Sequence, residues 1–423
     1  EAIVRQGSEF STVVRLGSVE KLLQANFRKL GVRIFCGSQS AASSTSDFSP
    51  ETVGRVVADT VAMARAASPD PAAGLPDRAL YAPVTAALDL FHPAAVDSEE
   101  KIALARRCEE AALRHDPRIN NSEGSGFSDA LIRIAYCNSL GVCESYCKTV
   151  ASLYASPLAE LDGLKQRDYW LTTHVDMARL ESPDAVGTKA ARRVLRRLGA
   201  RKVETAELPV VFDPLAAGRF LSFLAEAVCG TALMRKASFL LDRLGSRVAS
   251  PLVTIVDDAL EPAGLGSRPF DSEGVPSQTT MVVDQGILMG YLLDSYSARK
   301  LGMRSTGSST REPSGAPKVG PSNFYLKPGS HSPDEIIRSV DRGLYVTELI
   351  GFGVNIVSGN YSQGAAGIWI ERGELAYPVE EITVAGNLRE MLLGIEAVGN
   401  DPVPVAETFA PTVKIGKMVV SGN

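Results

Sequence analysis

The second half of the chain alternates short apolar runs with glycine and proline, and this pattern restricts the folds open to it. Runs such as SPLVTIVDD, TTMVVDQGILMGYLLD and PTVKIGKMVV have the length of single strands. Two pairs of runs meet at a two-residue turn, Gln285-Gly286 and Arg372-Gly373, which is typical of a β-hairpin. The exception is one long helical pattern, from Leu215 to about Leu244. A large antiparallel, barrel-like sheet with one long helix is therefore expected over residues 201–423.

The first half mixes strand and helix patterns. Alternation around Phe10 and the run GVRIFCG predict strands of one small sheet, followed by a polar loop, SQSAASSTSDFS. Helices are predicted to begin at Ser49-Pro50, in SEEKIALARRCEEAALRHD and near residue 180, while strand-like runs are broken by Gly126 and Gly141. The expected fold class is α+β, with an N-terminal mixed α/β domain over residues 1–200. Two domains suit the length, because one core rarely serves more than roughly 250–300 residues.

Histidines are scarce, which limits the metal chemistry available to the chain. The 423 residues include four, and no two lie within four positions of each other. A helix turn that presents two histidines to one zinc ion, as HExxH sites do, is therefore excluded. Single ligands from distant segments remain an alternative. The histidines are His92, His115, His174 and His331.

Charge and cysteine content indicate an ordinary globular protein. The net charge of −5 gives no reason to expect nucleic acid or an anionic membrane as partner, and no apolar run approaches the ~20 residues that span a bilayer. A basic stretch from Lys189 to Lys202 is interpreted as a solvated helix face rather than an anion site. The six cysteines favour buried free thiols over a metal cluster, which predicts a reducing, cytoplasmic compartment. No signal peptide is visible, although the sequence begins at Glu1 rather than methionine.

Two features of the second half are candidates for a site. The segment Gly351–Gly367 is glycine-rich but lacks phosphate-binding spacing, so a tight loop is favoured over a phosphate cradle. We expect this segment to line the domain interior and a cleft. Its candidate cleft residues are Gly351, Asn355, Gly359, Tyr361 and Gly364. Glu226 is a lone carboxylate in the apolar pattern FLSFLAEAVCGTALM, and the sequence leaves open whether it lies at a helix edge or faces a cleft.

Long motifs resemble the TldD/PmbA family over nearly the whole chain. The matching runs include LGSRVASPLVTIVDD, GLGSRPFDSEGVPSQTT, VGPSNFYLKPG, VSGNYSQGAAGIWIERGELAYPVEEITVAGNL and APTVKIGKMVV. Weaker matches cover the first domain, among them HVDMARLESPDAVGTKAARRVL. Motifs of this length make a chance similarity implausible.

The resemblance implies where a metal site would lie and that it is incomplete. The zinc-binding members carry H-E-x-x-x-H on a helix and a cysteine near the C-terminus, and this chain has FLAEAVCGT at the helix. Ala225 and Gly230 stand at the two histidine positions, and Glu226 is retained at the position of the general base. No cysteine follows Cys229. No metal or other cofactor is expected in this chain, and zinc is expected in a TldD-like partner.

The function implied is that of a non-catalytic subunit of a TldD/TldE-type metalloprotease complex. Such complexes act on short or unfolded peptides of the antitoxin or microcin-precursor type, and this chain would contribute dimerisation and the substrate cleft. The alternative is a self-sufficient homodimer that binds peptides or modulates gyrase without protease activity. A third reading is an independent hydrolase; Cys229 with Glu226 is a poor candidate for its site because no histidine lies within 50 residues.

Overall fold

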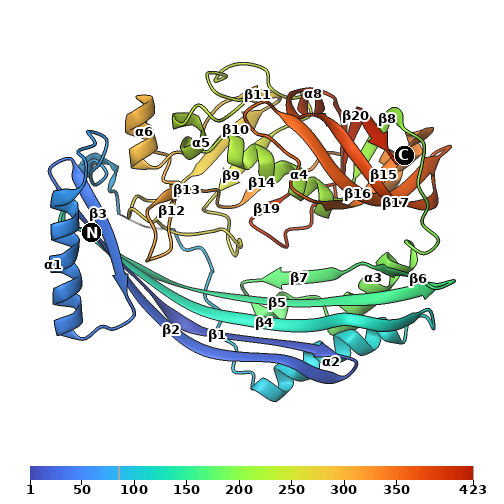
Figure 1. The fold of residues 1–423 in the computed structure, drawn as a ribbon, viewed down its shortest axis with the longest axis horizontal. Helices are drawn as coiled ribbons and strands as arrows, with labels where there is room; N and C mark the ends of the chain where they lie inside the picture. The colour runs from blue at the N-terminus through green and yellow to red at the C-terminus, as the bar shows by residue number, and fades with distance from the viewer. Residues whose placement is uncertain (84–85, 423) are drawn as a thin grey trace.

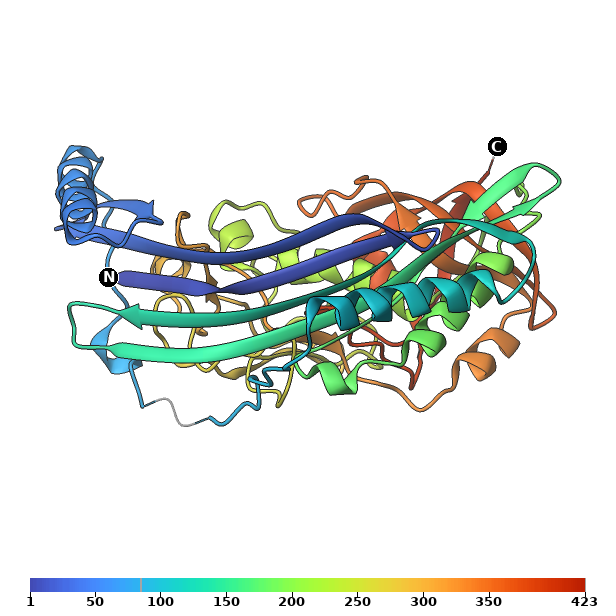
Figure 2. The same cartoon turned by 90° about the horizontal axis from the view of Figure 1, so that it is seen from below.

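The N-terminal part is built on one curved antiparallel sheet. The computed structural model describes residues 1–83 and 86–422. Seven strands pair in the order β3-β2-β1-β4-β5-β6, with β7 also on β5 (Figures 1 and 2). The strands are β1 (Ala2–Arg15), β2 (Ser18–Cys36), β3 (Gln39–Thr45), β4 (Ile119–Cys137), β5 (Cys143–Leu161), β6 (Leu164–Arg167) and β7 (Trp170–His174). The sheet spans much of the molecule's length, with the second half of the chain above it in Figure 1.

Three details of the predicted N-terminal sheet are wrong. The sheet is not small, because β2, β4 and β5 each have 19 residues. The polar segment after Cys36 is strand β3, since its backbone pairs with β2 whatever its side chains. Gly126 does not break a strand either. It pairs with Tyr154, and a Cβ there would lie 2.4 Å from the Tyr154 ring, so close packing requires glycine.

The predicted helices of the first half are confirmed. They are α1 (Pro50–Ala66), α2 (Ser98–Leu113) and α3 (Pro183–Leu195), accompanied by the short 3₁₀ segments η1 (Arg78–Leu80) and η2 (Met177–Arg179). Each of these α-helices is preceded by an N-cap residue whose side chain accepts a hydrogen bond from a backbone amide of the first turn, as Ser49 does before Pro50. Helices α2 and α3 pack on β4 and β5, and Figure 1 shows α2 on the side of the sheet away from the C-terminal domain.

The barrel predicted for the second half is confirmed. Six strands are ordered β17-β16-β15-β8-β20-β18, and β17 also pairs with β20, so five of them close on themselves. All these pairs are antiparallel except β8 with β15. The strands are β8 (Ala206–Phe212), β15 (Arg342–Ile350), β16 (Asn360–Glu371), β17 (Glu374–Asn387), β18 (Ile395–Val398) and β20 (Val413–Ser421).

A second C-terminal sheet and five short helices pack around the barrel. The sheet order is β11-β10-β9-β14-β19, and a separate pair joins β12 to β13. Its strands are β9 (Ile255–Asp258), β10 (Thr279–Asp284), β11 (Ile287–Leu288), β14 (Phe324–Leu326) and β19 (Thr408–Phe409), with β12 (Ser309–Thr310) and β13 (Lys318–Val319) apart. The helices are α4 (Pro214–Ala227), α5 (Gly230–Met234), α6 (Ser295–Leu301), α7 (Pro333–Arg338) and α8 (Leu388–Leu393).

Both predicted hairpin turns are confirmed, whereas the long helix is shorter than predicted. Arg372 and Gly373 turn between β16 and β17 with φ of 50° and 78°, as a type I′ turn requires. The helix expected to reach Leu244 ends at Ala227. The chain there pairs with a neighbouring segment, since the Gly230 amide donates to the Leu292 carbonyl at 2.7 Å. This tertiary pairing stops a pattern that local propensity would continue.

The prediction that the cysteines are free thiols is wrong for two of the six. Cys137 and Cys143 face each other at the end of the β4–β5 hairpin and form a disulfide, with Cα atoms 4.2 Å apart. Cys36, Cys108, Cys147 and Cys229 are free, and two of these are buried. The hairpin register is what brings the bonded pair together.

Among the described residues, no helix has the length and apolar character needed to span a membrane.

The basic stretch on α3 joins the two halves of the molecule, so its interpretation as a solvated face is wrong for part of it. Arg193 bonds to Asp168 at 3.1 Å, to Asp213 at 3.0 Å and to the Thr347 carbonyl at 3.2 Å. Burial alone would lower the pKa of Arg193, but the two carboxylates raise it above its usual value. Four residues on, Arg197 bonds to Glu348 at 2.5 Å. One face of α3 thus meets the C-terminal domain.

Replacing Arg193 tests this contact. Arg193→Ala would leave two carboxylates, both less than 3 % exposed, without their main partner. We expect the free energy of unfolding to fall by about 3–5 kcal/mol in urea titrations. Arg192→Ala, at an exposed position of the same helix, should change it by less than about 0.5 kcal/mol. Equal effects of the two substitutions would contradict the assignment.

Candidate functional site

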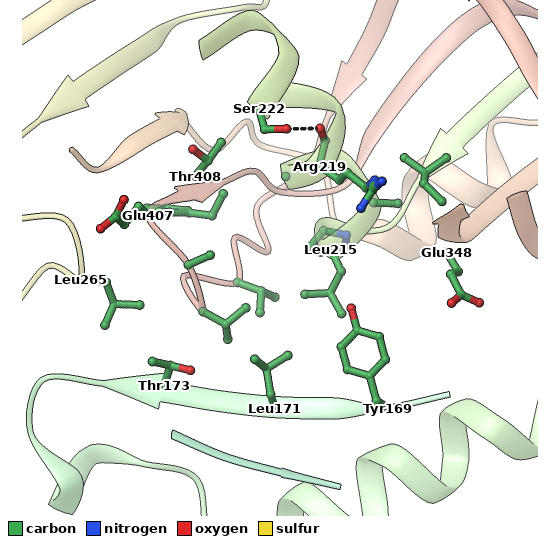
Figure 3. A pocket seen from close by; sticks show the side chains of 18 of the residues that line it. Tyr169, Leu171, Thr173, Leu215, Arg219, Ser222, Leu265, Glu348, Glu407 and Thr408 are labelled. Atoms are coloured by element: carbon green, nitrogen blue, oxygen red, sulfur yellow. Dashed lines mark hydrogen bonds between the residues drawn. The ribbon is translucent and has the colours of Figure 1, made fainter. Parts of the chain in front are cut away.

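A cleft of about 980 Å³ lies between the N-terminal sheet and the C-terminal domain. Strand β7 and the residue before it line one side with the alternate residues Tyr169, Leu171 and Thr173, whose side chains point toward the opposite wall in Figure 3. The opposite wall comes from the first turns of α4, the end of β15 and residues 403–409. Among the described strands, β7 pairs only with β5, so an edge strand of the sheet borders the cleft.

Helix α4 presents one polar face toward this cleft. Its N-cap is Asp213, whose carboxylate accepts a hydrogen bond from the Ala216 amide at 2.9 Å and also pairs with Arg193. Leu215, Arg219 and Ser222 line the cleft from successive turns. Because residues three and four apart share a helix face, Glu226 continues the same face one turn beyond the cleft. Its side chain is exposed, which agrees with a position at the helix edge.

Charged side chains at the cleft are held by neighbours from both domains. The Arg219 guanidinium donates to the Gly351 carbonyl at 2.8 Å, which ties α4 to the loop after β15. Glu348 accepts from Arg197 and, at 3.2 Å, from Arg167 of β6. The cleft walls are therefore fixed relative to each other by interactions that cross between domains.

The two positions where the family resemblance places metal ligands are filled by packing. Ala225 is only 2 % exposed and belongs to the main hydrophobic core. At Gly230, a Cβ would lie 2.3 Å from the Ser297 Oγ and 2.9 Å from a methyl group of Leu293. No group of three or more His, Cys, Asp or Glu side chains that could hold a metal occurs within residues 1–83 and 86–422. The residues present do not fit a zinc ion at this helix.

Cys229 is equally unsuited to nucleophilic chemistry. Its Sγ donates to the Ala225 carbonyl at 3.1 Å in a buried position. Burial, with the carboxylates of Asp257, Glu226 and Asp294, raises the pKa of this thiol to about 12. The thiolate that attack requires is therefore negligible at neutral pH.

The predicted cleft residues of Gly351–Gly367 are divided between surface and core. Gly351 and Asn355 are exposed on the loop between β15 and β16. Tyr361 is 2 % exposed and meets the rings of Phe220 and Phe223 edge to face. Gly359 is buried at the loop's end and Gly364 lies in strand β16. A role of these residues in binding stays a prediction, and their link to the cleft is the Gly351 carbonyl.

Sequence reasoning missed the residues that line the cleft. The alternation in DYWLTTH was a visible signal for Tyr169, Leu171 and Thr173 on one face of a strand. Nothing local in the sequence indicated that this face lies opposite α4. The apposition depends on Arg193, whose partners are 20 and 25 residues away or more.

Comparison with known proteins identifies the family of this chain. Models of the PmbA/TldA metallopeptidase domains match residues 1–64, 91–198 and 205–422. Metalloprotease PmbA of Escherichia coli O157:H7 is 39 % identical over the whole chain and 92 % of its own length. The chain belongs to the PmbA/TldD metallopeptidase family.

Solved structures share the fold. A candidate modulator of DNA gyrase from Bacteroides thetaiotaomicron has a TM-score of 0.92 at 28 % identity, covering 100 % of this chain and 94 % of that one. TldE from Thermococcus kodakarensis has a TM-score of 0.90 at 22 % identity, covering 100 % and 96 %. The second likeness is one of fold alone.

Introducing the two histidines tests whether the site is closed. The double variant Ala225→His, Gly230→His should bind less than a tenth of an equivalent of zinc per chain by elemental analysis after dialysis, roughly the level of the unaltered protein. It should also unfold more easily, by about 1–3 kcal/mol or more, because both side chains enter packed space. One tightly held zinc per variant chain would contradict this.

Alkylation tests the state of Cys229. With a pKa of about 12, its thiol should react negligibly with iodoacetamide between about pH 7 and pH 9 while the protein is folded. The half-buried thiols of Cys36 and Cys147 should be modified first, as seen by peptide mass spectrometry. Unfolding in urea should make all the free thiols react. Rapid modification of Cys229 in the folded protein at pH 8 would refute its assignment as a packed residue.

Proposed function

We propose that this chain is a non-catalytic subunit of a TldD/TldE-type peptidase complex. It would form a heterodimer with a TldD-like subunit that holds the zinc ion, and together they would cleave short or unfolded peptides. The observation that carries the proposal is the packing at Ala225 and Gly230, since a subunit without room for ligands depends on a partner for metal chemistry. The name TldE of a structural relative is consistent with this role.

An exposed apolar face supports the need for a partner. The loop between β15 and β16 carries Phe352, which is 94 % exposed, together with Val357, and Ile350 at the end of β15 is also exposed. Backbone bonds tie this loop to two neighbouring segments: the Phe239 amide donates to Ile356, and the Leu388 amide of α8 donates to Gly359. Helix α8 is in turn joined to a third segment, since the Ser250 amide donates to Leu392. The further exposed residues of this partner face are Leu244, Leu252, Met289 and Leu393. Apolar patches of this kind mark protein interfaces.

The same face is close to the retained glutamate. Ser238 donates to the Ala227 carbonyl at 2.6 Å, so the segment that leads to the partner face is anchored at the end of α4 beside Glu226. A partner docked there would bring its own metal helix near the end of the cleft. This arrangement would let one subunit supply the chemistry and the other a wall of the substrate site.

The cleft suits an extended peptide. An edge strand, β7, borders it, and the apolar residues Leu171 and Leu215 lie between polar ones along its walls. An edge strand can capture a peptide through backbone hydrogen bonds that are indifferent to side-chain identity. Peptides of the antitoxin or microcin-precursor type, which lack stable structure, would meet this requirement. A cytoplasmic location is part of the proposal.

A second function is favoured by one relative. The Bacteroides protein described as a candidate modulator of DNA gyrase is 28 % identical along the whole chain. A homodimer that binds peptides or modulates gyrase without cleaving anything is therefore the alternative. Under it, the partner face would be covered by a second copy of this chain.

Reconstitution separates the two functions. We expect an unfolded reporter peptide to be cleaved only by the mixture of this chain with a TldD-type subunit, and a chelator to abolish cleavage. Phe352→Asp should weaken assembly at least ~10-fold by analytical ultracentrifugation, because it places a charge in the apolar face. Leu164→Asp, at a 63 % exposed position of the N-terminal sheet, is the matched control and should have no effect. Cleavage by this chain alone would rule out both functions.

A further inference from the structure

A smaller pocket of about 340 Å³ adjoins the interdomain cleft near the start of strand β5. The two share Val150, Leu265 and Glu407 among their lining residues, so they are neighbouring parts of one depression between the domains. The smaller pocket has an apolar wall that includes Ile132, Ile134 and Tyr146 from the sheet. From the other domain Phe270 meets Tyr146 edge to face, with ring centres 5.2 Å apart.

Four cationic side chains line the rest of this pocket: Arg5, Lys148, Arg268 and Arg311. The Arg311 side chain is only 2 % exposed, and one of its nitrogens bonds to Glu1 at 2.7 Å. Its Nε and Nη2 are buried without an acceptor among the described residues. Arg268 donates once, to the Pro321 carbonyl at 3.4 Å, and its Nε and Nη2 are likewise buried without an acceptor.

Carboxylates of the protein offset part of this charge, since Glu1 pairs with Arg311 and Glu407 lines the pocket near Lys148, but none accepts from the unbonded nitrogens of Arg268 and Arg311 within the described chain. Asp271 is engaged by three backbone amides, and burial together with Glu273 raises its pKa. Glu312 is bonded to Arg5 and is 69 % exposed. Lys148 donates to the carbonyls of Leu265 and Ser267 and forms no ion pair with another described residue. Buried cationic donors without acceptors are costly, and a carboxylate satisfies two guanidinium donors at once.

We propose that this pocket binds the C-terminal carboxylate of a peptide lying in the interdomain cleft, with the last side chain of that peptide against the apolar wall. The inference rests on the proposed function only in requiring that the cleft takes peptides. Continuity with the cleft, unpaired buried arginine donors and an apolar wall together match a peptide end, which joins a carboxylate to a side chain. A bare acidic side chain would use the cations and leave the wall uncovered.

Three versions of one fluorescent peptide test this. The first has a free C-terminal carboxylate after an apolar residue, the second has the same sequence as an amide, and the third is an amide with an internal glutamate. Fluorescence anisotropy measures binding to the full chain, alone and mixed with a TldD-type subunit. We expect the amide to bind roughly tenfold more weakly than the acid, and the internal glutamate not to restore affinity.

Variants assign the effect to the pocket. Arg268→Met should remove most of the tenfold preference for the acid, whereas Arg268→Lys should keep part of it. Arg243→Met, at an exposed arginine outside this pocket, is the matched control and should leave the preference unchanged. Thermal unfolding of each variant checks that it is folded, and Lys148→Met serves as a second probe if Arg268→Met does not fold.

The possible failures are distinguishable. Equal binding of acid and amide would overturn the carboxylate site while leaving peptide binding intact. Restored affinity with the internal glutamate would overturn the assignment to the peptide terminus. Absence of binding by all three peptides, with and without the second subunit, would remove the peptide-binding function itself and this inference with it.

Discussion

The guanidinium of Arg193 makes the interaction on which the arrangement of the N-terminal sheet and the C-terminal barrel depends. It joins Asp168 before β7, Asp213 at the start of α4 and the backbone of β15. These three elements are the walls of the interdomain cleft. A buried charge held by two carboxylates tolerates little displacement, because any separation exposes unpaired charge to a low-dielectric interior. The position of the cleft therefore follows from one arginine and its partners.

At the end of helix α4, close packing fills the positions where the family resemblance would place metal ligands. Where zinc-binding relatives are expected to place histidines, this chain has an alanine in the main core and a glycine against Ser297. The space that a ligand would need is occupied by neighbouring atoms. Only Glu226 keeps its place on the exposed face of α4, in line with the cleft residues Arg219 and Ser222. The helix retains its architecture and serves as a wall of the cleft.

Sequence patterns predicted the parts of this fold that depend on local rules. The hairpin turn at Arg372-Gly373 and the helix start at Ser49-Pro50 follow from backbone preferences of a few residues, and both are confirmed. The helix beyond Ala227 and the loop that proved to be β3 were mispredicted, because backbone pairing with another segment, Leu292 in the first case and strand β2 in the second, overrode local preference. The family resemblance predicted Ala225 and Gly230 as degenerate ligand positions, but motif comparison carries no information on whether such positions are open or packed.

The cleft could not be predicted from local sequence patterns, because its walls come from distant parts of the chain. Tyr169 and Leu215 face each other from different domains, and only the folded chain brings them together (Figure 3). The basic stretch was visible, yet its separation into exposed Arg192 and buried Arg193 depends on which side of α3 meets the barrel. Whether a charged residue of this stretch is exposed or buried can be predicted only when its partners are known.

We propose that catalysis belongs to the partner and cleft formation to this chain. The most direct test is a complex assembled from this chain and a TldD-type subunit whose general-base glutamate is replaced by glutamine. We expect that the complex still forms and still binds an unfolded peptide, but that cleavage, followed by mass spectrometry, falls to background. Cleavage that persists at the rate of the unaltered complex would place the catalytic groups in this chain and contradict the account.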